Sequence, residues 1–223
     1  MRTRGIVLIL VLVGVFAAHM SAQTRELSVQ EYDDAMKAAS EATEGKSRRV
    51  AVTTTDSDKG KQPQVRMSVY EYIPPDRFHS RPVPADGAWE YIEVGKHGFY
   101  HDKGKPWEYF PMGGSDIPPY LFWWPKSAGP GTEIRLSRVR EEKLDGKKVL
   151  KYSRECVQNF ESPKGHPPTP SVLGIEDIWV GPDGTFLKAE ASYYDAAKTT
   201  LVQTWSLTFE YNPKDLKIEA PIK

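Results

Sequence analysis

The chain has 223 residues, with 30 Lys and Arg against 30 Asp and Glu, and 39% of its residues are hydrophobic. This formal net charge of zero argues against a nucleic-acid-binding protein or a polybasic membrane-surface protein, because both need an excess of positive charge. Cys156 is the only cysteine, so an intramolecular disulfide is excluded.

The beginning of the chain has the pattern of a secretory signal peptide. Arg2 and Arg4 precede the apolar stretch 6–18, which is shorter than the roughly 20 residues needed to span a bilayer. The small residues Ser21 and Ala22 indicate cleavage after Ala22. We therefore expect residues 1–22 to be removed, and residues 23–223 to form one domain that is soluble in the periplasm.

One long helix is predicted, near the start of this domain. Ser28 and Glu31 have the spacing of a capping box, in which each side chain bonds to the backbone of the other residue. Apolar residues then recur at helical spacing at Val29, Tyr32, Met36 and Ala39. The pattern predicts an amphipathic helix over residues 29–42.

The rest of the chain is predicted to be mostly β, with short runs rich in β-branched and aromatic residues between turn residues. These runs predict strands at residues 48–55, 64–72, 89–94, 98–102, 107–110, 132–141, 148–157, 175–180, 185–194, 199–211 and 216–219. The fold class is therefore α+β with a large antiparallel sheet.

Alternation along the strands predicts that one face of the sheet is apolar. The clearest case is Trp205, Leu207 and Phe209, which alternate with Thr and Ser residues. The same alternation places Val65, Met67 and Val69 on one face of their strand, and Leu187, Ala189 and Ala191 on one face of another. A single helix about 20 Å long covers only part of such a face.

Two proline-rich segments interrupt the strands. Residues 111–131 surround the aromatic run 120–124 with prolines and glycines, which favours a lid over an apolar cavity or a loop packed permanently on the core. Residues 160–174 are predicted to be an extended surface loop.

The sequence contains no recognisable catalytic or phosphate-binding motif. His97 and His101 are four residues apart, but on one strand that spacing is about 13 Å, so surface histidines are favoured over a metal pair. Cys156 is interpreted as a small buried hydrophobic residue. We expect neither a cofactor nor a metal, and no enzymatic activity.

Several motifs, in their order along the chain, resemble the outer-membrane lipoprotein carrier and sorting superfamily (LolA/LolB-like), in its broad and mostly uncharacterised branch. The motifs are Val69-Tyr70-Glu71-Tyr72-Ile73-Pro74-Pro75, Trp89-Glu90-Tyr91-Ile92-Glu93-Val94-Gly95, Leu144-Asp145-Gly146-Lys147-Lys148, Ile178-Trp179-Val180-Gly181-Pro182-Asp183-Gly184 and Tyr211-Asn212-Pro213. The resemblance covers most of residues 23–223.

The resemblance implies a strongly curved antiparallel sheet, an incomplete β-barrel, whose concave face is covered by the N-terminal helix and the proline and aromatic lid. It also implies that the cavity takes up acyl chains of lipoproteins or other lipids. One departure is Ile73, which stands where the lipoprotein carriers have an arginine before the proline of the turn, whereas Arg77 lies three residues beyond Pro74.

The leading hypothesis is a periplasmic carrier or sensor for a hydrophobic ligand. Its partners would be a lipid or a lipidated protein, with envelope membrane proteins as further candidates, no nucleic acid, and a monomeric state. The residues predicted to form the cavity and lid are Val65, Met67, Val69, Tyr120, Leu121, Phe122, Trp123, Trp124, Leu187, Trp205, Leu207 and Phe209.

Two alternatives remain open at this point. The first is a carbohydrate-binding module with an aromatic platform, for which Trp89, Trp107 and Trp123 would form a flat exposed row. The second, ranked last, is a hydrolase that uses His97 or His101 with a carboxylate.

Overall fold

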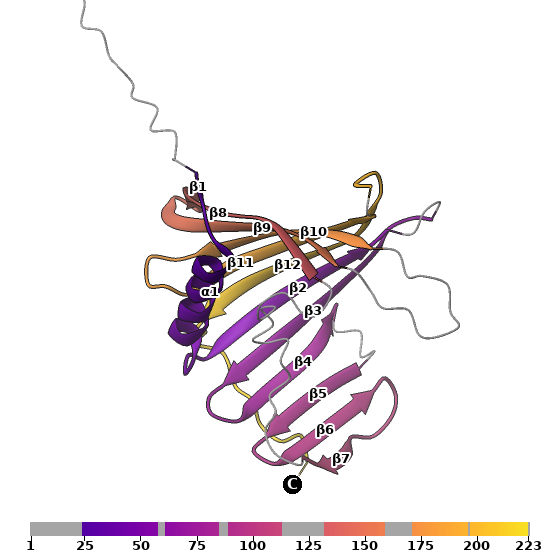
Figure 1. Cartoon of the computed structure of the whole chain (residues 1–223). Coiled ribbons are helices and arrows are strands. Elements are labelled where there is room, and N and C mark those ends of the chain that lie inside the picture. Colours follow the sequence, from indigo (N-terminus) through magenta and orange to yellow (C-terminus); the bar gives the residue numbers. More distant parts are fainter. Residues whose placement is uncertain are drawn as a thin grey trace, which may run out of the picture.

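The computed structural model describes residues 24–57, 61–84, 89–112, 132–158, 171–195 and 197–222. Within these residues, twelve strands form a single antiparallel sheet and one helix lies against it (Figure 1). The predicted signal peptide and the aromatic run 120–124 lie outside the described residues.

The helix is α1 (Val29–Thr43). The strands are β1 (Arg25–Glu26), β2 (Arg48–Asp56), β3 (Gln64–Ile73), β4 (Arg77–Val83), β5 (Trp89–Val94), β6 (His97–Asp102), β7 (Glu108–Pro111), β8 (Thr132–Leu144), β9 (Lys147–Gln158), β10 (Val172–Val180), β11 (Phe186–Asp195) and β12 (Leu201–Tyr211).

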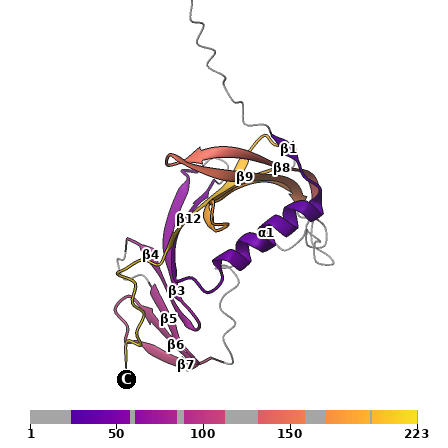
Figure 2. The ribbon, with the colours of Figure 1, turned by 90° about the vertical axis from the view of Figure 1, so that its left-hand side faces the viewer.

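The sheet is strongly curved and does not close. Its strand order is β1-β8-β9-β10-β11-β12-β2-β3-β4-β5-β6-β7, so β1 and β7 are the two edges. Viewed along the sheet, the strands bend around α1, which lies on the concave side (Figure 2). The architecture is an open half-barrel with an N-terminal helix, as predicted from the sequence.

Capping and burial together define α1. The predicted capping box is present: Glu31 N donates to Ser28 Oγ at 3.2 Å, and Ser28 N donates to Glu31 Oε2 at 2.8 Å. The apolar side of the helix packs on the concave face in one cluster with Ile178, Val180, Phe186 and Ala189. Within the described residues, no helix is long and apolar enough to cross a membrane.

A buried arginine holds the C-terminal end of α1. Arg48 is the first residue of β2, and its Nη1 donates to the carbonyl of Thr43 at 3.3 Å. The guanidinium also lies 4.6 Å from the ring centroid of Tyr72. A cation suits this position because the last carbonyls of a helix carry partial negative charge.

The strand register assigns residues to the concave or the convex face, because directly paired residues share a face. Val50 pairs with Tyr70 and with Phe209, which places all three on the concave face. Their neighbours Trp205 and Leu207 follow on the same face by alternation.

One predicted part of the apolar face is wrong. Val65, Met67 and Val69 alternate with the concave residues of β3, so they lie on the opposite, convex face from Trp205, Leu207 and Phe209. Val65 is 61% exposed and Met67 is 44% exposed. The alternation was read correctly within the strand, but alternation alone does not tell which face is buried.

A register shift changes the concave residues of β11. The pairing slips between Trp179 and Val180, so that Val180 pairs with Phe186. Phe186, rather than the predicted Leu187, therefore joins the buried cluster beneath α1. Leu187 instead lies beside Gly181.

Three elements differ from the sequence prediction. Strands β1 and β4 were not predicted; β4 follows a proline turn and contains Pro82. Residues 216–219 are not a strand. They cross the convex face as an irregular segment, in which Leu216 and Ile218 pack on Ile92 and Phe99.

Ion pairs stabilise the convex face between β2 and β5. Arg49 Nε donates to Glu71 Oε1 at 2.7 Å, and Arg49 Nη2 donates to Asp215 of the C-terminal segment at 3.0 Å. The two ring nitrogens of His79 lie 2.9 Å from Glu71 Oε2 and 2.7 Å from Glu90 Oε1. The His79 hydrogen bond and the Arg49 ion pair lower the pKa of the Glu71 carboxyl to about 2.

The assignment of faces predicts that the same substitution, Val→Ala, lowers the free energy of unfolding much more in β2 than in the neighbouring strand β3. Val50 is 2% exposed, so Val50→Ala should lower the free energy of unfolding by about 2 kcal/mol. Val65→Ala should change it by less than about 0.5 kcal/mol, because Val65 is exposed. Urea unfolding measures both values, and equal costs would contradict the register.

The lowered pKa of Glu71 predicts a loss of stability in acid. The native state favours the ionised carboxylate, so its stabilisation is complete above the unfolded-state pKa near 4.5 and is lost as the pH falls towards 2. Glu71→Gln should make the free energy of unfolding fall less steeply over this interval. Urea unfolding at several acidic pH values tests this, and identical slopes for the two proteins would refute it.

Candidate functional site

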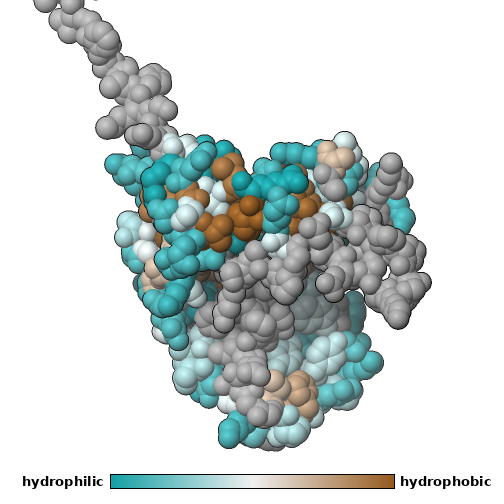
Figure 3. Space-filling view, in the orientation of Figure 1, coloured by the Kyte–Doolittle hydropathy of each residue, from teal (hydrophilic) through white to brown (hydrophobic). Residues whose placement is uncertain are grey.

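The concave face is apolar beneath α1. Tyr32, Met36 and Ala39 of the helix pack on Ile178, Val180 and Phe186, with Leu207 and Phe209 at the margin of the cluster. In the view of Figure 3, hydrophobic surface gathers in the upper part of the molecule with hydrophilic residues around it. The helix lies at one end of the strands, and the strands extend well beyond it to the other end (Figure 1).

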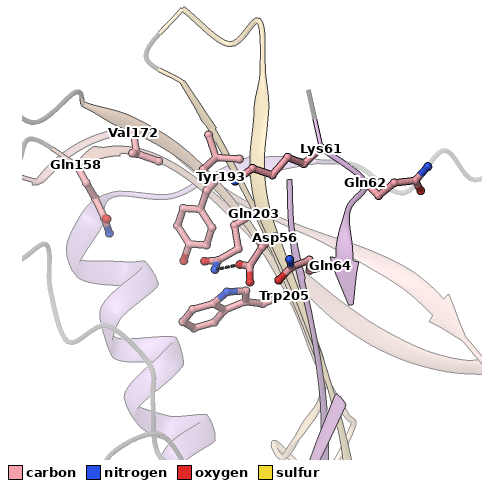
Figure 4. A pocket seen from close by; sticks show the side chains of 10 residues that line it. Asp56, Lys61, Gln62, Gln64, Gln158, Val172, Tyr193, Gln203 and Trp205 are labelled. Carbon is pink, nitrogen blue, oxygen red and sulfur yellow. Dashed lines mark hydrogen bonds between the residues drawn. The ribbon is translucent and has the colours of Figure 1, made fainter. Parts of the chain in front are cut away.

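A cavity of about 520 Å³ lies at this other end, and we call it the rim cavity. Tyr193, Gln203, Trp205 and Asp56 point towards one another at its centre (Figure 4). The remaining lining residues are Lys61, Gln62, Gln64, Gln158, Val172 and Val202. The cavity thus combines an aromatic centre with several side-chain amides.

A second cavity of about 570 Å³ adjoins the first, and we call it the wall cavity. Its described lining comes from β2, β3, β12, the end of β4 and the first residue of β5, and includes Val52, Tyr70 and Trp89. Gln203 and Trp205 line both cavities, so the two cavities meet at these side chains. Together they extend across the concave face from β9 to β5.

Hydrogen bonds fix the orientation of Gln203. Its Nε2 donates to Asp56 Oδ1 at 2.6 Å, and Asp56 also forms an ion pair with Arg66. The hydrogen bond from Gln203 and the charge of Arg66 lower the pKa of Asp56, which therefore stays ionised and accepts hydrogen bonds only. The carbonyl oxygen Oε1 of Gln203 is left as an acceptor.

Between the rim cavity and the apolar cluster lies a buried ion pair. Arg154 of β9 donates from Nε and Nη2 to Glu176 Oε2 of β10, at 3.0 and 2.7 Å. The register pairs Glu176 with Ala191, which places the ion pair on the concave face. Tyr32 of α1 covers it, with its ring centroid 5.1 Å from the guanidinium carbon.

Several solved structures are similar to this chain over most of its length. LprF from Mycobacterium bovis superposes with a TM-score of 0.44 at 14% identity, covering 88% of this chain and 99% of that one. The lipoprotein LppX from Mycobacterium tuberculosis gives a TM-score of 0.44 at 13% identity over 86% of this chain and 100% of that one. A LolA superfamily protein from Nitrosomonas europaea gives 0.35 at 10% identity over 86% and 96%.

No protein-family model and no curated protein matches the sequence. At these identities and TM-scores the similarity is one of fold and assigns no ligand to this chain.

The structure brings only some of the predicted site residues to the concave face. Trp205 lines both cavities, and Leu207 and Phe209 pack beside the buried clusters. Val65 and Met67 reach only the wall cavity, from the convex side of β3. The predicted lid residues Tyr120, Leu121, Phe122, Trp123 and Trp124 lie outside the described part of the chain.

Sequence reasoning missed Asp56, Gln158, Tyr193 and Gln203. They come from four different strands, so no local motif joins them. Alternation held a usable signal for two of them, because Gln203 is two residues before Trp205 and Tyr193 is two residues after Ala191. Both therefore share the face of a residue already assigned to it.

The aromatic row of the carbohydrate-binding alternative is not assembled as predicted. Trp89 lines the wall cavity on the concave face, whereas Trp107 packs beside Phe99 and Ile92 on the convex face, so these two do not form a row. His97 contacts Tyr109, and His101 contacts Trp107. Among the described residues, no group of three or more His, Cys, Asp or Glu side chains is placed to hold a metal ion.

Cys156 is buried, as predicted from its place in a strand. Its side chain lies on the concave face of β9 opposite Gly174, and burial raises the pKa of the thiol. Such a thiol is protonated at neutral pH and packs as a small apolar group.

The buried ion pair predicts a strongly non-additive mutant cycle. Arg154→Met leaves Glu176 buried without its cation and should lower the free energy of unfolding by about 3–5 kcal/mol. Adding Glu176→Leu removes the uncompensated charge and should recover most of the loss. Urea unfolding of the two single variants and the double variant measures the interaction free energy between the two side chains. Additive losses would contradict a coupled, buried ion pair.

Proposed function

We propose that this protein is an exported, periplasmic carrier or sensor that binds a hydrophobic ligand on the concave face of the half-barrel. The ligand is a lipid or the acyl chain of a lipidated protein. The observation that supports this proposal is the pair of adjoining cavities, which meet at Trp205 beyond the end of the face that α1 covers.

The size of the cavities suits such a ligand. Volumes of about 520 and 570 Å³ each lie within the range of small-molecule binding sites, roughly 300–1,000 Å³. Aromatic side chains in the linings of the two cavities offer large apolar surfaces to a chain, namely Trp205, Tyr193, Tyr70 and Trp89.

The free energy of chain burial sets how long a chain must be for micromolar affinity. Each buried methylene contributes about 0.8 kcal/mol, so a chain of about ten methylenes gains about 8 kcal/mol before the cost of association. A dissociation constant in the micromolar range corresponds to about 8 kcal/mol of net binding free energy. A longer chain or a polar contact offsets the association cost.

The junction residue provides the direct test of this site. Trp205→Ala removes an indole from both cavities and should weaken binding of a fluorescent fatty acid by about tenfold or more, which corresponds to about 1.4 kcal/mol. Titration of the lipid-free protein, followed by probe fluorescence, gives the dissociation constants.

Trp107→Ala is the matched control, because it removes the same side chain from the convex face. It should lower the free energy of unfolding and leave the dissociation constant unchanged. Equal effects of the two substitutions on probe binding, or no binding by the parent protein, would contradict a ligand site on the concave face.

A further inference from the structure

Three exposed apolar side chains gather at one end of the sheet. Val65 is 61% exposed, Met67 is 44% exposed and Val202 is 42% exposed. Val65 and Met67 belong to β3 and Val202 belongs to β12, and strand β2 lies between these two strands. This end of the sheet carries the β2–β3 and β11–β12 connections and lies away from α1 (Figure 1).

The same three residues border the two cavities. Val202 lines the rim cavity, whereas Val65 and Met67 line the wall cavity. Each residue therefore borders a cavity and also exposes much of its side chain to solvent. We call these three residues the cavity lip.

The end of β3 that carries Val65 and Met67 is exposed on both faces. Its first four residues, 64–67, are all exposed, although a strand of an antiparallel sheet commonly buries one of its two faces. This end of β3 therefore projects beyond the covered part of the sheet. Exposed apolar side chains that gather in one place indicate a surface that contacts a partner.

The outer surface next to the lip carries hydroxyl groups rather than charges. Val65 pairs with Thr55 of β2, and Met67 pairs with Thr53. Farther along β2 the convex face becomes charged, beginning at Arg49 with its ion pairs. The lip and its neighbours on β2 thus have no charge that would lose its hydration on leaving water.

The charges near the lip do not oppose contact with phosphate groups. Among the described residues, Lys61 and Lys198 are exposed in the two connections at this end. The carboxylate of Asp56 pairs with Arg66, and the carboxylate of Asp195 accepts hydrogen bonds within the β11–β12 connection. Apolar side chains bordered by lysines are typical of surfaces that lie on phospholipid.

From this arrangement we infer that the cavity lip docks on a phospholipid bilayer. Because the three side chains project from strand ends, a fluid lipid surface can surround them, whereas a rigid protein surface does so only with a matching pocket. A water-insoluble ligand then passes between the bilayer and the concave face without crossing water, because the same residues border the cavities. The route of the ligand rests on the proposed function, whereas the docking itself does not.

Flotation with lipid vesicles tests the docking. Lipid-free protein is mixed with vesicles of phosphatidylcholine that contain about 30% phosphatidylglycerol, and the floating fraction gives a partition coefficient. We expect the parent protein to float. The double variant Val65→Asp/Met67→Asp should partition about tenfold less, because its carboxylates replace apolar side chains and are repelled by the anionic lipid. Val202→Asp should also partition less, since it changes the lip on a different strand.

Val29→Asp is the matched control. Val29 is 46% exposed, but it begins α1 and lies away from the lip (Figure 1). A carboxylate is favourable in the first turn of a helix, so this variant should float like the parent protein. Circular dichroism and urea unfolding establish that each variant is folded, which is expected because all of these side chains are exposed.

The kinetics of ligand transfer test the route through the lip. A fluorescent fatty acid is loaded into the vesicles, and its transfer to the protein is followed by fluorescence. Transfer during docking has a rate that rises with protein concentration and falls in Val65→Asp/Met67→Asp. Transfer through water is limited by release from the vesicle, so a rate independent of protein concentration would overturn the route.

The outcomes separate the docking from ligand binding. A parent protein that does not float would overturn the docking, as would a loss of partition in Val29→Asp as large as in the lip variants. Binding of a fluorescent fatty acid from solution would still support the proposed function in either case. A protein that floats but takes up no fatty acid, from vesicles or from solution, would overturn the proposed function and support the docking alone.

Discussion

The structure depends on one constraint, which is that a curved sheet has a concave apolar face larger than a single helix can cover. Helix α1 has 15 residues and is about 22 Å long by its rise per residue. It buries Ile178, Val180 and Phe186 near one end of the strands. The remaining concave surface holds the two cavities that meet at Trp205, and the proposed function rests on this space, which α1 does not occupy.

Buried polar groups position the helix on this face. Arg48 donates to the last turn of α1, and the Arg154–Glu176 pair lies beneath Tyr32 near its first turn. Buried charges are costly unless they are paired, so they favour one placement of the helix over others. On the convex face, Arg49 joins β2 to the C-terminal segment through Asp215, which holds Leu216 and Ile218 over Ile92 and Phe99.

The sequence was sufficient to predict the helix, its capping box, most strands and the half-barrel with its N-terminal helix. These features follow from local periodicity, or from the order of motifs along the chain. The face assignment of Val65 was not predictable, because a strand with apolar residues on alternate positions can present them to either side. Leu187 was misplaced for a different reason, since the register shift opposite Val180 cannot be read from one strand alone.

The candidate site was less predictable than the fold. Trp205 was identified because it belongs to the longest alternating strand, but Asp56 and Gln158 could be recognised as lining residues only once β2 and β9 are placed in space. Polar residues at strand ends are common in sheets. Nothing in the local sequence distinguishes a polar residue that lines a cavity from one that faces solvent at the end of a strand. Their joint position on the concave face is a product of register and curvature.

The most direct measurement is mass spectrometry of organic extracts from the protein purified from its native host without detergent. The account predicts a hydrophobic compound present in roughly equal molar amount, and lost from a Trp205→Ala variant purified in parallel. An extract without such a compound, from a protein that also fails to take up added lipid, would contradict the claim that the concave face holds a ligand.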